Sequence, residues 1–130
     1  MDKLLLFLNS AYLGLGSFFS FFVAPTLFQT LTREQAGAVV GKVFPVYFSL
    51  GLMIALATSL LSFKISKGVF SVALFNLLLQ GIHLFYLQPK AHALKAIEYT
   101  AFMKLHGISM GMNLLSLLLT LVICILLIRR

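Results

Sequence analysis

The sequence predicts an all-α integral membrane protein: a bundle of four transmembrane helices, with a short interfacial helix between spans 1 and 2 and an extended amphipathic start to span 4. Of its 130 residues, 61% are hydrophobic and only 10% are charged, whereas a soluble domain carries about a quarter charged residues. Four windows contain no Asp, Glu, Lys or Arg. Each window exceeds the ~20 helical residues that cross a hydrocarbon core about 30 Å thick. These observations exclude soluble enzymes, secreted disulfide scaffolds and disordered chains.

The four windows define the spans of one membrane domain over residues 1–130. They are Leu4–Ala24, Val43–Phe63, Gly68–Pro89 and Leu105–Ile128. The first is longer than the apolar region of a cleaved signal peptide, so we expect a retained span. Four spans bring both termini to one side, the terminal face, where the short link at 64–67 also lies. The opposite side, the loop face, carries two longer connections, at 25–42 and 90–104.

Both longer connections carry helix signals. Thr32 and Gln35 have the spacing of a capping box, which predicts a short interfacial helix with a small-residue surface at Gly37 and Gly41. In the second connection, apolar residues recur at helical spacing from Leu94 to Leu105, so span 4 should start outside the membrane core. The prolines sit where a missing N–H does little harm. We expect Pro25 and Pro89 to end spans 1 and 3, and Pro45 to lie in the first turn of span 2.

The net charge of +7 indicates lipid headgroups as the partner rather than nucleic acid. The cations occur only between apolar windows, where they face headgroups. Five lie on each face, so the positive-inside rule does not choose an orientation; their clustering in short segments favours cytoplasmic termini. A homo-oligomer stays open, including an antiparallel dimer. The compact chain favours a bacterial cytoplasmic membrane.

Each span carries a stripe of polar or small residues. In span 3, Asn76, Gln80 and His83 share a face; in span 4, Ser109, Asn113, Ser116 and Thr120 do. His106 extends the span 4 stripe, and Tyr47 lies on the corresponding face of span 2. Two interpretations stay open. The stripes hydrogen-bond between helices, or they line a pocket at the loop face formed by Asn76, Gln80, His83, His106, Ser109, Asn113 and Tyr47.

The positions of the acidic residues and the histidines limit the mechanisms and ligands that fit this sequence. Asp2, Glu34 and Glu98 all lie away from the middle of a span, which disfavours a proton-coupled exporter with an embedded acid. All three histidines fall on the loop-face half. His83 and His106, on adjacent antiparallel helices, are candidate ligands for haem iron or copper, and Met103, Met110 and Met112 surround His106. The alternative is that His83 hydrogen-bonds to a neighbouring side chain, while the other two histidines lie at the membrane interface. Cys124 is the single cysteine, so no disulfide or Cys-x-x-Cys pair forms within the chain.

Several segments resemble the transmembrane protein 205-like family. They are Val23–Phe28, Glu34–Gly37, Val43–Phe48 and Phe102–Ser109, with Asn113 downstream. Gln88 stands where the family is expected to have an acid before Pro89. The resemblance implies a small helical membrane protein without an established activity, and more distantly a likeness to four-span proteins that use intramembrane histidines. The motif residues it marks are Pro25, Phe28, Glu34, Gln35, Phe44, Pro45, Tyr47, His106, Gly107, Ser109 and Asn113.

Three functions are compatible with these patterns. The first is a non-enzymatic protein that handles a small solute or ion in the loop-face pocket, behind a cationic mouth of Arg33, Lys42 and Lys104. The second is a haem- or copper-binding redox or metal-handling protein using His83 and His106. The third is an assembly or scaffold protein, with Gly107 and Gly111 as a helix-docking face. The patterns favour a protein that is not an enzyme.

Overall fold

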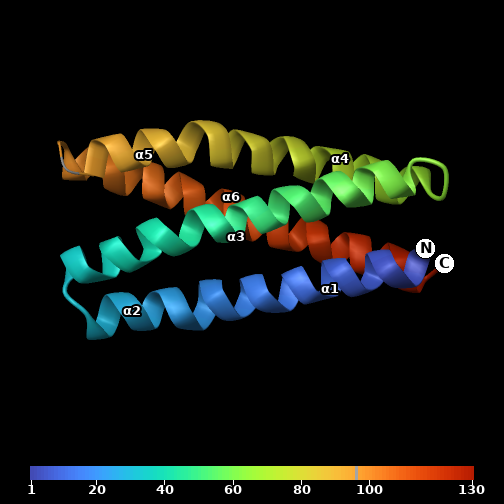
Figure 1. Cartoon of the computed structure of the whole chain (residues 1–130), viewed down its shortest axis with the longest axis horizontal. Helices are drawn as coiled ribbons and strands as arrows, with labels where there is room; N and C mark the ends of the chain where they lie inside the picture. Colours follow the sequence, from blue (N-terminus) through green and yellow to red (C-terminus); the bar gives the residue numbers. More distant parts are fainter. Residues whose placement is uncertain (96) are drawn as a thin grey trace.

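A computed structural model of the chain describes residues 1–95 and 97–130, and this part is entirely helical or in short turns. The chain forms antiparallel rods of similar length (Figure 1). In order, the elements are α1 (Asp2–Phe18), the π-helix η1 (Phe19–Val23), α2 (Ala24–Thr30), α3 (Arg33–Ser62), α4 (Lys67–Ile82), the π-helix η2 (His83–Leu87), α5 (Gln88–Lys95) and α6 (Tyr99–Ile128).

Within the described residues, four continuous helical stretches are long and apolar enough to cross a membrane, which confirms the predicted four-span bundle. They cover Asp2–Thr30, Arg33–Ser62, Lys67–Leu94 and Thr100–Ile128. Both termini and the turn between α3 and α4 lie at one end of the bundle (Figure 1). There the Arg130 guanidinium donates to Asp2 Oδ2 from Nε at 2.6 Å and to the Ile65 carbonyl from Nη1 at 2.8 Å. The terminal face therefore has the arrangement that the sequence predicts.

The capping box at Thr32 starts a longer helix than expected. The Gln35 N–H donates to Thr32 Oγ1, and the Thr32 N–H donates to Gln35 Oε1, at 3.2 and 3.3 Å. The expected short interfacial helix is not a separate element, because α3 runs from Arg33 to Ser62 without a break. Pro45, which we expected in the first turn of span 2, lies instead in the interior of α3, because this helix already begins at Arg33 and continues past the proline to Ser62.

Pro25 and Pro89 do not end spans 1 and 3, contrary to the expectation from sequence. A proline removes an i to i−4 hydrogen bond and its ring crowds the preceding turn. Here each proline follows a π-turn: the Ala24 N–H bonds to Phe19 O, and the Gln88 N–H bonds to His83 O, both five residues back. The wider turn accommodates the proline, and the helix continues as α2 or α5. The two halves of the chain share this order of elements.

Span 4 starts outside its apolar window, at Tyr99 rather than Leu105. The amphipathic start of span 4 is shorter than the sequence pattern predicts. Leu94 ends the preceding span, and Ile97 lies in the turn between the two spans. The Glu98 N–H donates to the Leu94 carbonyl at 2.8 Å and closes that turn. The pattern also includes Ala96, which lies outside the described residues.

The interior divides into two apolar clusters. One, near the termini, contains Leu5, Val69, Ala73, Ile123 and Leu127. The other contains Tyr12, Phe19, Ala24, Val40, Phe44, Tyr47, Phe48 and Leu117. Towards the loop end, α2 packs against α3 and α5 packs against α6. These two pairs diverge in the view of Figure 1, and the candidate site lies between them.

Candidate functional site

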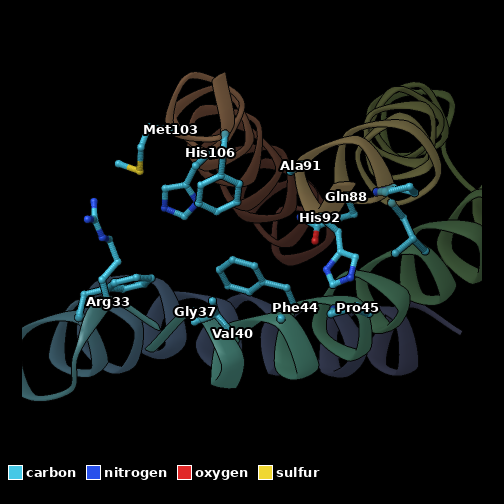
Figure 2. A pocket seen from close by; sticks show the side chains of 15 residues that line it. Arg33, Gly37, Val40, Phe44, Pro45, Gln88, Ala91, His92, Met103 and His106 are labelled. Carbon is cyan, nitrogen blue, oxygen red and sulfur yellow. The ribbon is translucent and has the colours of Figure 1, made fainter. Parts of the chain in front are cut away.

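A cleft of about 780 Å³ opens between the first half of α3 and the α5–α6 pair at the loop end. One wall is α3, and α5 and α6 face it across the opening (Figure 2). The cleft is lined by Phe28, Arg33, Gly37, Val40, Gly41, Phe44, Pro45, Leu84, Gln88, Pro89, Ala91, His92, Phe102, Met103 and His106. Its volume is within the range of about 300–1,000 Å³ typical of small-molecule sites.

Most of the cleft wall is apolar, and its polar groups are few and separated. Arg33 extends from the start of α3 towards Met103, while His92 points from α5 towards Pro45 at the other end (Figure 2). Gln88 lies beside His92, and His106 lies on the opposite wall from Phe44. Among the described residues that line the cleft there is no Asp or Glu. The cleft thus combines apolar walls with one formal positive charge.

His106 lies among three phenylalanine rings. The ring centroids of Phe28, Phe44 and Phe102 are 6.2, 6.5 and 5.9 Å from that of the imidazole. Phe28, Phe44 and His106 also line a smaller cavity of about 190 Å³, together with Ser20 and Pro25 from the η1–α2 segment. These three side chains therefore form the partition between the cleft and the smaller cavity.

Pro45 changes the hydrogen bonding of the cleft wall. Because proline has no N–H, the Gly41 carbonyl four residues earlier lacks its ordinary helical donor. Gly41 and Pro45 both line the cleft.

The polar stripes meet inside the bundle, where they form a hydrogen-bonded chain across three spans. Gln80 Nε2 donates to Tyr12 Oη at 3.1 Å and to Ser116 Oγ at 2.7 Å. The Ser116 hydroxyl donates to Asn76 Oδ1 at 2.6 Å, and Asn76 Nδ2 lies 3.5 Å from Thr120 Oγ1. All five side chains are buried. The chain links α1, α4 and α6.

Further polar contacts in the interior involve other predicted pocket residues. Tyr47 donates to Asn113 Oδ1 at 2.9 Å, and Asn113 Nδ2 donates to Ser20 Oγ at 2.7 Å, which joins α3, α6 and η1. His83 Nε2 is hydrogen-bonded to Ser109 Oγ. Its imidazole packs on the Phe48 ring, with the centroids 3.9 Å apart.

The buried polar atoms of the stripes are therefore satisfied within the protein. Over the described residues, Ser62 Oγ is the one buried side-chain polar atom without a hydrogen-bond partner. Of the seven residues predicted to line a pocket, only His106 lines the cleft; the other six lie in the hydrogen-bonded interior. Their part in function stays a prediction.

The described residues contain no group of three or more His, Cys, Asp or Glu side chains placed to hold a metal ion. His83 uses Nε2 in its contact with Ser109, whereas His106 stands among phenylalanine rings. The two histidines thus have different surroundings, one in the polar interior and one in the cleft wall. Binding of haem or copper by this pair stays a prediction.

Several motif residues surround the cleft, but the sequence patterns missed others. Phe28, Phe44, Pro45 and His106 line it; Pro25 lies at the smaller cavity; Glu34 and Gln35 belong to the exposed first turn of α3. Of the predicted cationic mouth, Arg33 lines the cleft, and Lys42 and Lys104 are exposed outside it. Gln88, Pro89 and Phe102 were missed as lining residues. The sequence contained one signal for these missed residues. Pro25 and Pro89 lie at matching positions, at the loop-face ends of spans 1 and 3.

The glycines of the predicted docking face lie on the outside of the bundle. Gly107 and Gly111 are exposed, and a Cβ atom added at either would meet nothing within 4 Å. The glycines are thus not used for helix packing within the described part of this chain. A role in assembly stays a prediction.

The fold and the cleft describe a small polytopic membrane protein, and the comparisons place it in a family. Residues 7–100 match the family described as a domain of unknown function, DUF4149, and the chain belongs to this family. It is 55% identical over 120 residues to an uncharacterized protein of Aquifex aeolicus (strain VF5), covering 92% of this chain and 91% of that protein. No solved structure matches. The likeness to the transmembrane protein 205-like family stays a resemblance in motifs.

Proposed function

We propose that this protein is a non-enzymatic component of the bacterial cytoplasmic membrane that binds a small molecule in the loop-end cleft. The observation that carries the proposal is the cleft itself, about 780 Å³ in volume with apolar walls and four polar or charged side chains. Binding sites for small molecules have this composition. The bacterial origin of the 55% identical relative supports the choice of membrane.

Binding, rather than catalysis, follows from the separation of the polar groups. A catalytic site needs a nucleophile, a base and charge-stabilising groups that converge on one reacting atom. Here Arg33 and His92 lie at opposite ends of the cleft (Figure 2), and His106 is surrounded by phenylalanine rings. Separated polar groups instead orient an apolar ligand that lies along the cleft.

The test is a substitution that places a larger side chain in the cleft from one of its own walls. Ala91 lines the cleft and is half-buried, whereas Ala93, two residues further along α5, is exposed and outside the lining. We expect Ala91→Trp to abolish binding, because the indole occupies the ligand volume, and the matched control Ala93→Trp to retain it. Native mass spectrometry of protein purified from bacterial membranes measures the bound small molecule as an added mass.

The proposal requires an added mass on the unsubstituted protein and on Ala93→Trp, and its loss from Ala91→Trp. An added mass present on all three proteins would place the ligand elsewhere. No added mass on any of them, after release from the gentlest detergent that keeps the protein folded, would contradict the proposal.

A further inference from the structure

The cleft extends from the depth of the lipid tails to that of the headgroups. Its inner residues belong to the charge-free windows of three spans, and they are Phe44, Pro45, Leu84, Gln88, Pro89 and His106. Its outer residues lie beyond those windows, and they include Arg33, Gly37, His92, Phe102 and Met103. Since the windows correspond to the hydrocarbon core, a molecule that fills the cleft has an uncharged part at the inner end, and its outer part meets Arg33, the one charged side chain among the described lining residues.

The outer end is positively charged. Arg33 extends from the start of α3 across the opening towards Met103 (Figure 2). A guanidinium binds a phosphate through two parallel hydrogen bonds, and it is positively charged at all physiological pH values. Cations at this depth attract anionic lipids by about 1 kcal/mol each.

The walls suit a flexible apolar chain. Three phenylalanines line the cleft, Phe28 from α2, Phe44 from α3 and Phe102 from α6, while Gly37 and Gly41 add no side chains to the α3 wall. The cleft is only partly enclosed, so a long flexible chain need not fit entirely inside it.

We propose that the ligand is an anionic phospholipid of the surrounding bilayer, with one acyl chain among the lining phenylalanines and its phosphate at Arg33. This inference rests on the proposed function, because it names the ligand class for the same cleft. The apolar walls of the cleft and the positive charge of its outer end each match a different part of such a lipid.

A tryptophan reporter tests the inference, because the chain has no tryptophan of its own and all tryptophan fluorescence then comes from the introduced residue. Phe102→Trp places the reporter in the cleft. Phe85→Trp places the control on η2 at a side chain that is 72% exposed on the outside of the bundle. Each variant is reconstituted in vesicles of phosphatidylcholine and phosphatidylglycerol, in which one lipid or the other carries brominated chains that quench on contact.

We expect brominated phosphatidylglycerol to quench the Phe102→Trp reporter more than brominated phosphatidylcholine at equal mole fraction, and both lipids to quench the Phe85→Trp control alike. Adding Arg33→Gln should reduce the anionic preference by about fivefold, the change that corresponds to about 1 kcal/mol for one cation. Adding Lys42→Gln, a cation of the same helix outside the cleft lining, should leave the preference nearly unchanged.

Two outcomes overturn the inference. Equal quenching of the Phe102→Trp reporter by the two lipids means that lipid enters without selection for negative charge, while binding in the cleft still stands. Quenching of the control alone means that no lipid chain enters the cleft. In that case an added mass that disappears in Ala91→Trp still supports the proposed function with a different ligand, and its absence contradicts both.

Discussion

Gly16 and Gly51 face the bundle interior at positions where an added methyl group would collide with a neighbouring span. A Cβ atom at Gly16 would meet the Tyr47 hydroxyl and lie 2.6 Å from a methyl carbon of Leu117. At Gly51 it would meet the Tyr12 hydroxyl and lie 2.6 Å from Gln80 Nε2. The glycines therefore allow the stacked Tyr12 and Tyr47 rings, 5.3 Å apart, to stand between the spans.

Gly51→Ala should lower the free energy of unfolding by about 1–3 kcal/mol, the usual cost of overpacking a well-packed interior. The matched control is Gly81→Ala, also within a span, where an added Cβ meets nothing within 4 Å. The control should be neutral or slightly stabilising, because alanine favours helix over glycine. Reversible unfolding in mixed micelles measures both, and equal stability of the two variants would show that Gly51 is not tightly packed.

The residue patterns predicted which polar side chains share a helix face, and the structure places those side chains in the interior. The same patterns did not decide between a hydrated pocket and hydrogen bonds, because that choice depends on distances between spans. Ser116, for example, accepts from Gln80 and donates to Asn76 only because α4 and α6 are adjacent. Periodicity gives a direction for each side chain but does not give its partner.

Between elements, Gln80 connects three spans, since its amide joins α4 to α1 and α6. Gln80→Leu removes both interhelical hydrogen bonds, each worth on average about 0.6 kcal/mol in a membrane bundle. We expect a loss of about 1 kcal/mol in unfolding free energy. Gln29→Leu, at an exposed position of α2, should change stability little. A loss in the control as large as that in Gln80→Leu would mean that the interior bonds contribute nothing specific.

The two π-helices explain why the predicted ends of spans 1 and 3 were wrong. A proline in a helical pattern normally marks an end, so the sequence placed the ends of spans 1 and 3 at Pro25 and Pro89. The π-turns at Phe19–Val23 and His83–Leu87 let both helices continue. No composition signal marks a π-turn in advance, because the turn depends on a single shifted hydrogen bond. The number of spans was predictable, since the charge-free windows of sufficient length determine it, whereas the ends of the helices were not, because the helices continue beyond the windows.

Over the whole molecule, the same extension of the helices creates the cleft. Had spans 1 and 3 ended at their prolines, α2 and α5 would not exist as walls or supports at the loop end. Their continuation lengthens both halves of the chain, and the two helix pairs diverge beyond the shared interior (Figure 1). The cleft could not be read from the sequence, because it arises from the angle between the pairs rather than from any residue pattern.

On this proposal a ligand enters the loop-end cleft, while the polar stripes form an interior that is closed to water. The direct measurement is the rate of cysteine modification by a water-soluble methanethiosulfonate reagent, in a Cys124→Ala background that removes the one native thiol. Ala91→Cys lines the cleft, and Ser116→Cys, a nearly isosteric change, lies in the interior. In detergent, after bound lipid has been removed, we expect rapid modification of Ala91→Cys at the outer end of the cleft and almost none of Ser116→Cys. Modification of Ser116→Cys as fast as that of Ala91→Cys would show water along the stripes and contradict this prediction.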